Sequence, residues 1–194
     1  MTKSCLCLPV LLLLFATTAT AAGTGSVTGK VTATPDKYLK DTVVYLKEVP
    51  GHYAPKTVTM DQKGMEFRPH ILTVTAGDSV KFLNSDGVDH NVYSPDHDAY
   101  NLGIFPKGQS RDHVFTKPGV YTQLCSVHPE MLAYIFVGQN PYSAAVNKDG
   151  TFKIENVPAG TYQLAVWNPK LKADETQVTV APGKPAQAEF ALAR

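Results

Sequence analysis

Short segments in which apolar and polar residues alternate recur along the chain, and turns rich in proline and glycine separate them. Residues 27–34 (VTGKVTAT) alternate in this way, and residues 71–84 (ILTVTAGDSVKFLN) give two strands around an Ala-Gly-Asp turn. Alternation with a period of two places every second side chain on the same face of a strand. Short strands with regularly spaced turns are typical of all-β sandwiches. We therefore predict an all-β fold, with at most a short helix within residues 94–104.

The first 22 residues have a different pattern from the rest of the chain. Lys3 precedes an apolar run over residues 6–15, and small residues follow as far as Ala22. This order is typical of a secretory signal peptide. The run is too short to cross a bilayer as a helix, which takes about 20 apolar residues. We expect residues 1–22 to be removed, leaving a periplasmic or secreted protein with no membrane span.

Removal of this segment would change both the charge and the cysteine count. Without Lys3 the chain has 17 basic and 17 acidic side chains, and the basic ones form no stripe. Nucleic acid is therefore not an expected partner. Cys5 and Cys7 would leave with the segment, so that Cys125 alone remains. One cysteine cannot form an internal disulfide, and a free thiol in an oxidising compartment needs to be buried or bound to a metal.

Cys125 is the first of several potential metal ligands in the segment YTQLCSVHPEM. His128 follows it by three residues, and Met131 follows His128 by three more. A thiolate, an imidazole and a thioether suit copper, and a type 1 copper site combines two histidines and a cysteine with a weak axial methionine. His90, in SDGVDHNVYS, can supply the second imidazole. We predict one type 1 copper ion, cycling between Cu(I) and Cu(II), with His90, Cys125, His128 and Met131 as ligands.

The other histidines are weaker candidates for metal binding. His70 begins a predicted strand and is expected to be structural, His113 lies within a strand and is expected at the surface, and His52 lies in a loop. His97 has an aspartate on each side in SPDHDAY. A secondary metal site at His97 remains an alternative.

Residues 57–140 resemble the cupredoxin family of type 1 copper proteins. The residues that carry the resemblance are FRPHILTVTAGDSVKFLNSD, HNV and GVYTQLCSVHPEM. The Cys-x2-His-x2-Met spacing is similar to the short ligand loop of amicyanins. The resemblance implies a Greek-key β-sandwich. It also implies that the backbone N–H of Asn91 donates to the sulfur of Cys125, and that His128 is the solvent-facing ligand through which electrons leave.

The segments on either side of this region have a pattern of their own. Residues 141–194, through DGTFKI and VPAGTYQLAV, resemble the carboxypeptidase-regulatory-like (transthyretin-like) β-sandwich family. That family opens with a strand pair similar to residues 25–46. We expect residues 23–56 and 141–194 to form a second, small β-sandwich, with the copper domain inserted at a loop. Alternatively, residues 25–56 add edge strands to the copper domain and residues 141–194 stand alone.

Together these features predict an exported mononuclear copper protein that carries single electrons between transient redox protein partners. An enzyme is not expected, because the chain has no histidine cluster for a second copper centre. Leu124 and Ser126 flank Cys125, where a His-Cys-His run would connect the two centres. The alternative function is copper handling, as a periplasmic chaperone or storage protein without an electron-transfer role.

Overall fold

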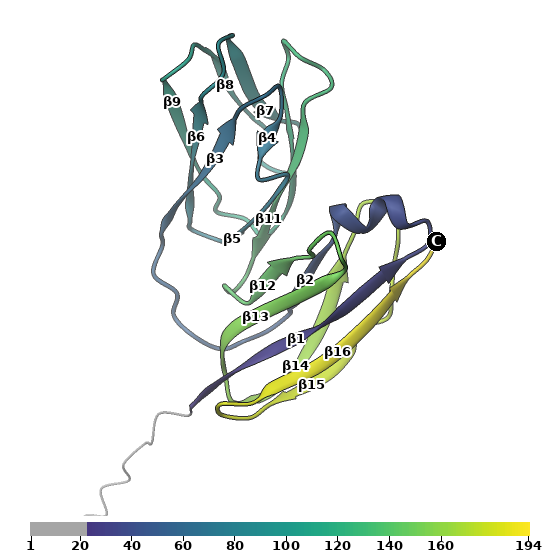
Figure 1. Ribbon diagram of the computed structural model, residues 1–194. Coiled ribbons are helices and arrows are strands. Elements are labelled where there is room, and N and C mark those ends of the chain that lie inside the picture. The colour runs from purple at the N-terminus through teal and green to yellow at the C-terminus, as the bar shows by residue number, and fades with distance from the viewer. Residues whose placement is uncertain (1–22) are drawn as a thin grey trace, which may run out of the picture.

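A computed structural model describes residues 23–194, so that the predicted signal peptide lies outside the described residues. Within that range the chain forms strands β1 to β16, which belong to four sheets, and one short 3-10 helix, η1 (Figure 1). The prediction of an all-β fold is confirmed. In the part of the chain that the structure describes, no helix has the length and apolar character needed to cross a membrane.

Two of the sheets come from the middle of the chain, and we call them the central sandwich. One has the strand order β4-β3-β6-β9 and the other β5-β11-β10-β7-β8. Their strands are β3 (Thr57–Gln62), β4 (Phe67–Arg68), β5 (Ile71–Thr75), β6 (Ser79–Asn84), β7 (His90–Ser94), β8 (Tyr100–Phe105), β9 (Ser110–Val114), β10 (Gly119–Leu124) and β11 (Leu132–Gly138). The chain crosses repeatedly between these sheets, and β3 pairs with β6, and β5 with β11, in parallel.

The core of the central sandwich forms because its strands turn apolar side chains inward, at alternate positions in strands such as β6. In β6 the buried positions are every second residue, Val80, Phe82 and Asn84. The apolar side chains of both sheets join one cluster that includes Tyr121 and Ile135. Full burial of a side chain such as Phe82 stabilises the fold by roughly 1.5–3 kcal/mol relative to exposure.

The short helix that the sequence allowed within residues 94–104 does not form. Ser94 ends β7, a bend follows, and the rest of the segment belongs to β8, which pairs antiparallel with β7. The register places Asn101 opposite Tyr93 and Tyr100 opposite Ser94. Pairing with β7 satisfies the backbone N–H and C=O groups that a helix would otherwise have paired internally.

The other two sheets form a second unit, which we call the flanking sandwich; it lies below the central one in Figure 1. Its sheets have the orders β13-β1-β16 and β12-β2-β14-β15. Its elements are β1 (Thr24–Ala33), η1 (Asp36–Asp41), β2 (Val43–Leu46), β12 (Ser143–Ala145), β13 (Thr151–Pro158), β14 (Gly160–Trp167), β15 (Thr176–Val180) and β16 (Pro185–Leu192). Strand β1 lies between β13 and β16, so segments from the two ends of the described chain share one sheet.

The two sandwiches contact each other through a small apolar cluster and through polar contacts. Buried Val43 of the flanking sandwich packs with Ile71 and Phe136 of the central one. Nδ2 of Asn140 donates to the carbonyl of Leu46 over 3.0 Å. These contacts join β2 to the segment that follows β11.

Candidate metal centre

Potential metal ligands from two distant parts of the chain meet at one end of β7 and β10. His90 is the first residue of β7, Cys125 directly follows β10, and His128 lies in the turn before β11. Nδ1 of His90 and Nδ1 of His128 are each 3.9 Å from Sγ of Cys125, and they are 3.0 Å from each other. His90 and Cys125 are buried, whereas His128 is partly exposed.

The spacing of these three atoms fits one metal ion. A triangle with sides of 3.0, 3.9 and 3.9 Å has a circumscribed circle with a radius of about 2.1 Å. In zinc sites, where the distances are well established, the metal lies about 2.0–2.1 Å from imidazole nitrogen and about 2.3 Å from cysteine sulfur. An ion near the centre of this triangle is therefore within bonding distance of all three donors. Within residues 23–194 no other group of three or more His, Cys, Asp or Glu side chains converges in this way.

Met131 lies beside these three residues. Its side chain is 1% exposed and belongs to the same core cluster as Cys125. Its backbone N–H donates to the carbonyl of His128 over 3.0 Å, which closes the turn that carries both residues. Two imidazoles, one thiol and one thioether form the pattern of a type 1 copper site, because soft sulfur donors favour copper over hard cations.

Asp86 orients the imidazole of His90. Its Oδ2 lies 2.8 Å from Nε2 of His90. Burial opposes ionisation of this carboxylate, but hydrogen bonds from the backbone N–H groups of Met65 and Gly64 and from His90 outweigh it and lower its pKa to about 2. An ionised carboxylate only accepts hydrogen bonds. Nε2 of His90 therefore carries the proton, which leaves the lone pair of Nδ1 free to bind a metal.

The sequence analysis did not single out Asp86. Its partners Gly64 and Met65 lie in a turn after β3 where both residues adopt left-handed φ angles, of 70° and 59°. The available signal was an aspartate four residues before a candidate ligand. The sequence could not show that Gly64 and Met65 would donate to Asp86, because these hydrogen bonds join residues more than 20 positions apart.

Asn91 connects the two segments that carry the ligands. Its backbone N–H donates to Sγ of Cys125 over 3.3 Å, so the contact implied by the family resemblance is confirmed. Its side chain accepts from the N–H of Ser126 over 3.2 Å and donates to Oδ1 of Asn101 over 2.8 Å. The N–H donor stabilises negative charge on the sulfur, and the side-chain contacts hold β7, β8 and the Cys125 loop in register.

The remaining histidines have other partners. Nε2 of His70 lies 2.7 Å from a carboxylate oxygen of Asp41 in η1. His113, expected at the surface, is half-buried and stacks on Tyr100 with ring centroids 3.8 Å apart, and burial lowers its pKa.

His97 is exposed, with its ring against Tyr121, and the two aspartates beside it are engaged elsewhere. Asp96 accepts from the backbone N–H of Thr122, and Asp98 pairs with Lys117. His97 is not part of the ligand group found in the described residues.

Comparison with known proteins identifies the class of this site. The family described as copper binding proteins, plastocyanin/azurin family, matches residues 54–138. Plastocyanin from Ulva prolifera is 33% identical over 79 residues, which are 35% of this chain and 80% of that protein. Chloroplastic plastocyanin from Chlamydomonas reinhardtii is 36% identical over 69 residues, which are 34% of this chain and 47% of that protein. The fold, the donor set and these matches define a cupredoxin domain whose cofactor is type 1 copper.

The chain belongs to the plastocyanin/azurin family of copper-binding proteins, and its match spans about half of the Chlamydomonas relative. Among solved structures, a copper-containing nitrite reductase from Thermus scotoductus SA-01 is 28% identical with a TM-score of 0.41, over 43% of this chain and 22% of that one. An amicyanin variant in the Cu(I) form is 26% identical with a TM-score of 0.40, over 42% and 81% of the two chains.

The C-terminal flank matches a different family. Residues 137–188 match the family described as polysaccharide lyase family 4, domain II. The sequence analysis compared residues 141–194 with the carboxypeptidase-regulatory-like family, so the two family descriptions differ. The structure forms strands β12 to β16 in this part of the chain.

Proposed function

We propose that this protein is an exported one-electron carrier with a single type 1 copper ion bound by His90, Cys125, His128 and Met131. The observation that carries the proposal is the convergence of two imidazole nitrogens and one sulfur around a point about 2.1 Å from each, a metal–ligand distance. When bound, copper in such a donor set supplies reversible one-electron transfer.

The protein's contribution to this function is a fixed and largely dry ligand set. Asp86 fixes the ring of His90, and the N–H of Asn91 points at the sulfur of Cys125. Because His90 and Cys125 are buried, water has little access from their side. Ligands that are already held in place need little rearrangement when the charge at the site changes by one.

Exposed apolar side chains occur close in the chain to the partly exposed His128 and to its fellow ligands, and they support docking of a redox partner. Exposed large apolar residues occur at Met65, Val88, Ile104, Val127 and Leu132, with 36%, 47%, 58%, 42% and 38% of their surface exposed. Met65 donates its backbone N–H to Asp86, and Val88 lies two residues before His90. Val127 adjoins His128, Leu132 adjoins Met131, and Ile104 pairs with Asn91. We infer that transient redox protein partners dock on this apolar rim, as small contacts of this kind suit brief encounters.

The arrangement of the sheets supports a division into two domains. We propose a copper-binding domain over residues 57–140, inserted into a discontinuous β-sandwich formed by residues 23–56 and 141–194. Pairing of β1 with β13 and β16, and of β2 with β12 and β14, favours this division over edge strands added to the copper domain.

We also infer export, from the signal-like pattern of residues 1–22, and a role as carrier rather than enzyme. Leu124 and Ser126 flank Cys125 at the positions where a His-Cys-His run would lead to a second copper centre.

Visible absorption and electron paramagnetic resonance of the protein with added Cu(II) test the proposal. We expect an intense thiolate-to-copper absorption band that Cys125→Ser abolishes, while the control variant Ser143→Ala, on β12 of the flanking sandwich, retains it. A reversible one-electron wave in voltammetry is expected from the wild type. A colourless complex that still holds copper in Cys125→Ser would refute the carrier and favour copper handling.

A further inference from the structure

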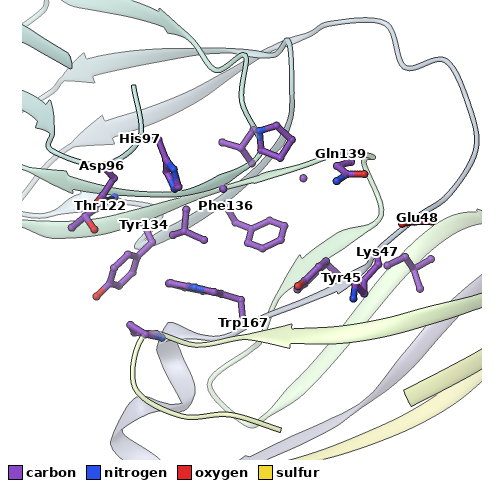
Figure 2. A pocket seen from close by; sticks show the side chains of 17 residues that line it. Tyr45, Lys47, Glu48, Asp96, His97, Thr122, Tyr134, Phe136, Gln139 and Trp167 are labelled. Carbon is purple, nitrogen blue, oxygen red and sulfur yellow. Dashed lines mark hydrogen bonds between the residues drawn. The ribbon is translucent and has the colours of Figure 1, made fainter. Parts of the chain in front are cut away.

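A cleft of about 740 Å³ lies between the two sandwiches, away from the metal ligands. Its lining on the central sandwich comes from β10, β11 and the 96–97 turn, and on the flanking sandwich from β2 and β14. Figure 2 shows Trp167 and Tyr45 on one side and Tyr134 and Phe136 on the other. The volume falls within the range of about 300–1,000 Å³ that is typical of small-molecule sites, which often lie at domain interfaces.

The aromatic walls of the cleft hold each other in place. The rings of Tyr45 and Phe136 have centroids 4.8 Å apart, and those of Tyr134 and Trp167 have centroids 5.2 Å apart. Each pair joins one ring from each sandwich, so the rings of a pair pack against each other, one pair tilted and the other edge to face. A ligand in the cleft can therefore contact only the parts of the ring faces that the partner ring leaves uncovered. A hydrogen bond from the side chain of Asn140 to the carbonyl of Leu46 adds a polar contact between the two sandwiches. The cleft is therefore formed before any ligand arrives.

Polar groups stand around these rings, and they include both donors and acceptors. Asp96 uses Oδ2 to accept from the N–H of Thr122 over 2.7 Å, and within the described residues Oδ1 makes no such contact. The exposed amide of Gln139 offers a donor and an acceptor at the opposite side of the cleft in Figure 2. Lys47 is paired with Glu175 over 2.8 Å, so its charge is already compensated.

We propose that this cleft binds a neutral saccharide. A sugar ring presents C–H groups on its faces, which pack on aromatic rings, and hydroxyl groups around its edge, which both donate and accept hydrogen bonds. The rings of Trp167 and Tyr134 suit the faces, and Asp96 and Gln139 suit the hydroxyls. A purely apolar ligand would remove water from Asp96 without replacing its hydrogen bonds. Anionic ligands are disfavoured because the carboxylates of Asp96 and Glu48 both line the cleft.

Trp167 is the single tryptophan of the chain, so its fluorescence reports on this cleft directly. The experiment titrates the full chain, copper-free and copper-loaded, with maltotriose, cellotriose and chitotriose, and it adds choline and p-cresol as competing ligand classes. We expect a saturable change in emission with at least one trisaccharide, with the same affinity in both forms because no metal ligand lines the cleft. Isothermal calorimetry of the same samples checks the stoichiometry of one.

Two variants test the polar contacts without disturbing the aromatic walls. Asp96→Asn keeps an oxygen that can accept from Thr122, and Gln139→Ala changes an exposed residue. Each is expected to weaken saccharide binding about 2- to 10-fold, the effect of one hydrogen bond. Asp112→Asn and Gln187→Ala, on exposed positions of β9 and β16, are the matched controls and should bind as the wild type does.

Three results would overturn the saccharide assignment. The first is no saturable response to any of the three trisaccharides. The second is a response to choline or p-cresol in their place, which would assign the cleft to an organic cation or an aromatic ligand. The third is equal affinity of the cleft variants and their controls. Binding in the copper-free form separates this test from the copper proposal, since each can fail alone.

Discussion

Removal of the Asp86 carboxylate tests whether a contact outside the ligand set prepares His90 for metal. In Asp86→Ala the N–H of a fully buried imidazole loses its acceptor, and the N–H groups of Gly64 and Met65 lose theirs. An unsatisfied buried donor costs about 1–3 kcal/mol. The two turn N–H groups are exposed to water, so we assign them about 1 kcal/mol together. The expected destabilisation of the copper-free protein at pH 7 is therefore about 2–4 kcal/mol.

Urea unfolding of the copper-free protein measures this loss. With a typical slope of about 2 kcal/mol per molar urea, the midpoint should fall by about 1–2 M. Copper affinity, measured by competition with a chelator, should fall about 10- to 100-fold, as is typical when the partner of a metal-binding histidine is removed. Asp86→Asn keeps an oxygen acceptor without the charge and should give intermediate values.

Asp89→Ala is the matched control, because Asp89 is an exposed aspartate one residue before His90. It should leave both the midpoint and the copper affinity close to wild type. If Asp86→Ala and Asp89→Ala behaved alike, the carboxylate of Asp86 would have no part in orienting His90. The reasoning from the 2.8 Å contact would then be refuted.

Two further predictions concern the axial ligand and the docking surface. Met131→Leu should keep the blue colour and raise the reduction potential, because a weak sulfur donor is lost. The buried volume is nearly conserved, so the free energy of unfolding should change by less than about 1.5 kcal/mol. A lower potential in voltammetry would contradict the assignment of Met131 as axial ligand. Val127→Lys, beside His128, should slow electron self-exchange about tenfold or more at low salt, because two like charges meet when the sites approach. Val114→Lys places the same charge on a residue of β9 that is 52% exposed, against 42% for Val127, and an equal effect there would show that the surface near His128 is not the contact surface.

Much of the site was readable from sequence because its ligands follow local rules. Cys125, His128 and Met131 lie within seven consecutive residues, and their thiol, imidazole and thioether groups indicate copper without reference to the rest of the fold. The alternation of apolar residues likewise indicated strands, since it reports which face of each strand is buried. The turn that holds Asp86 and the strand β8 were not readable in this way. Both depend on a partner that is elsewhere in the chain: β7 for β8, and residues 64–65 for Asp86.

The sequence by itself determined most of the strands, the donor atoms and hence the kind of metal. The tertiary structure alone decided how the two sandwiches meet, and so created the cleft between them. Tyr45, Tyr134, Phe136 and Trp167 lie on three strands, β2, β11 and β14, and the alternation pattern of each strand says nothing about the other two. They become neighbours only because β2 and β14 pack near β11. Tyr45 precedes Phe136 by about 90 residues and Trp167 follows Tyr134 by about 30 residues, and no local sequence pattern encodes contacts over such separations.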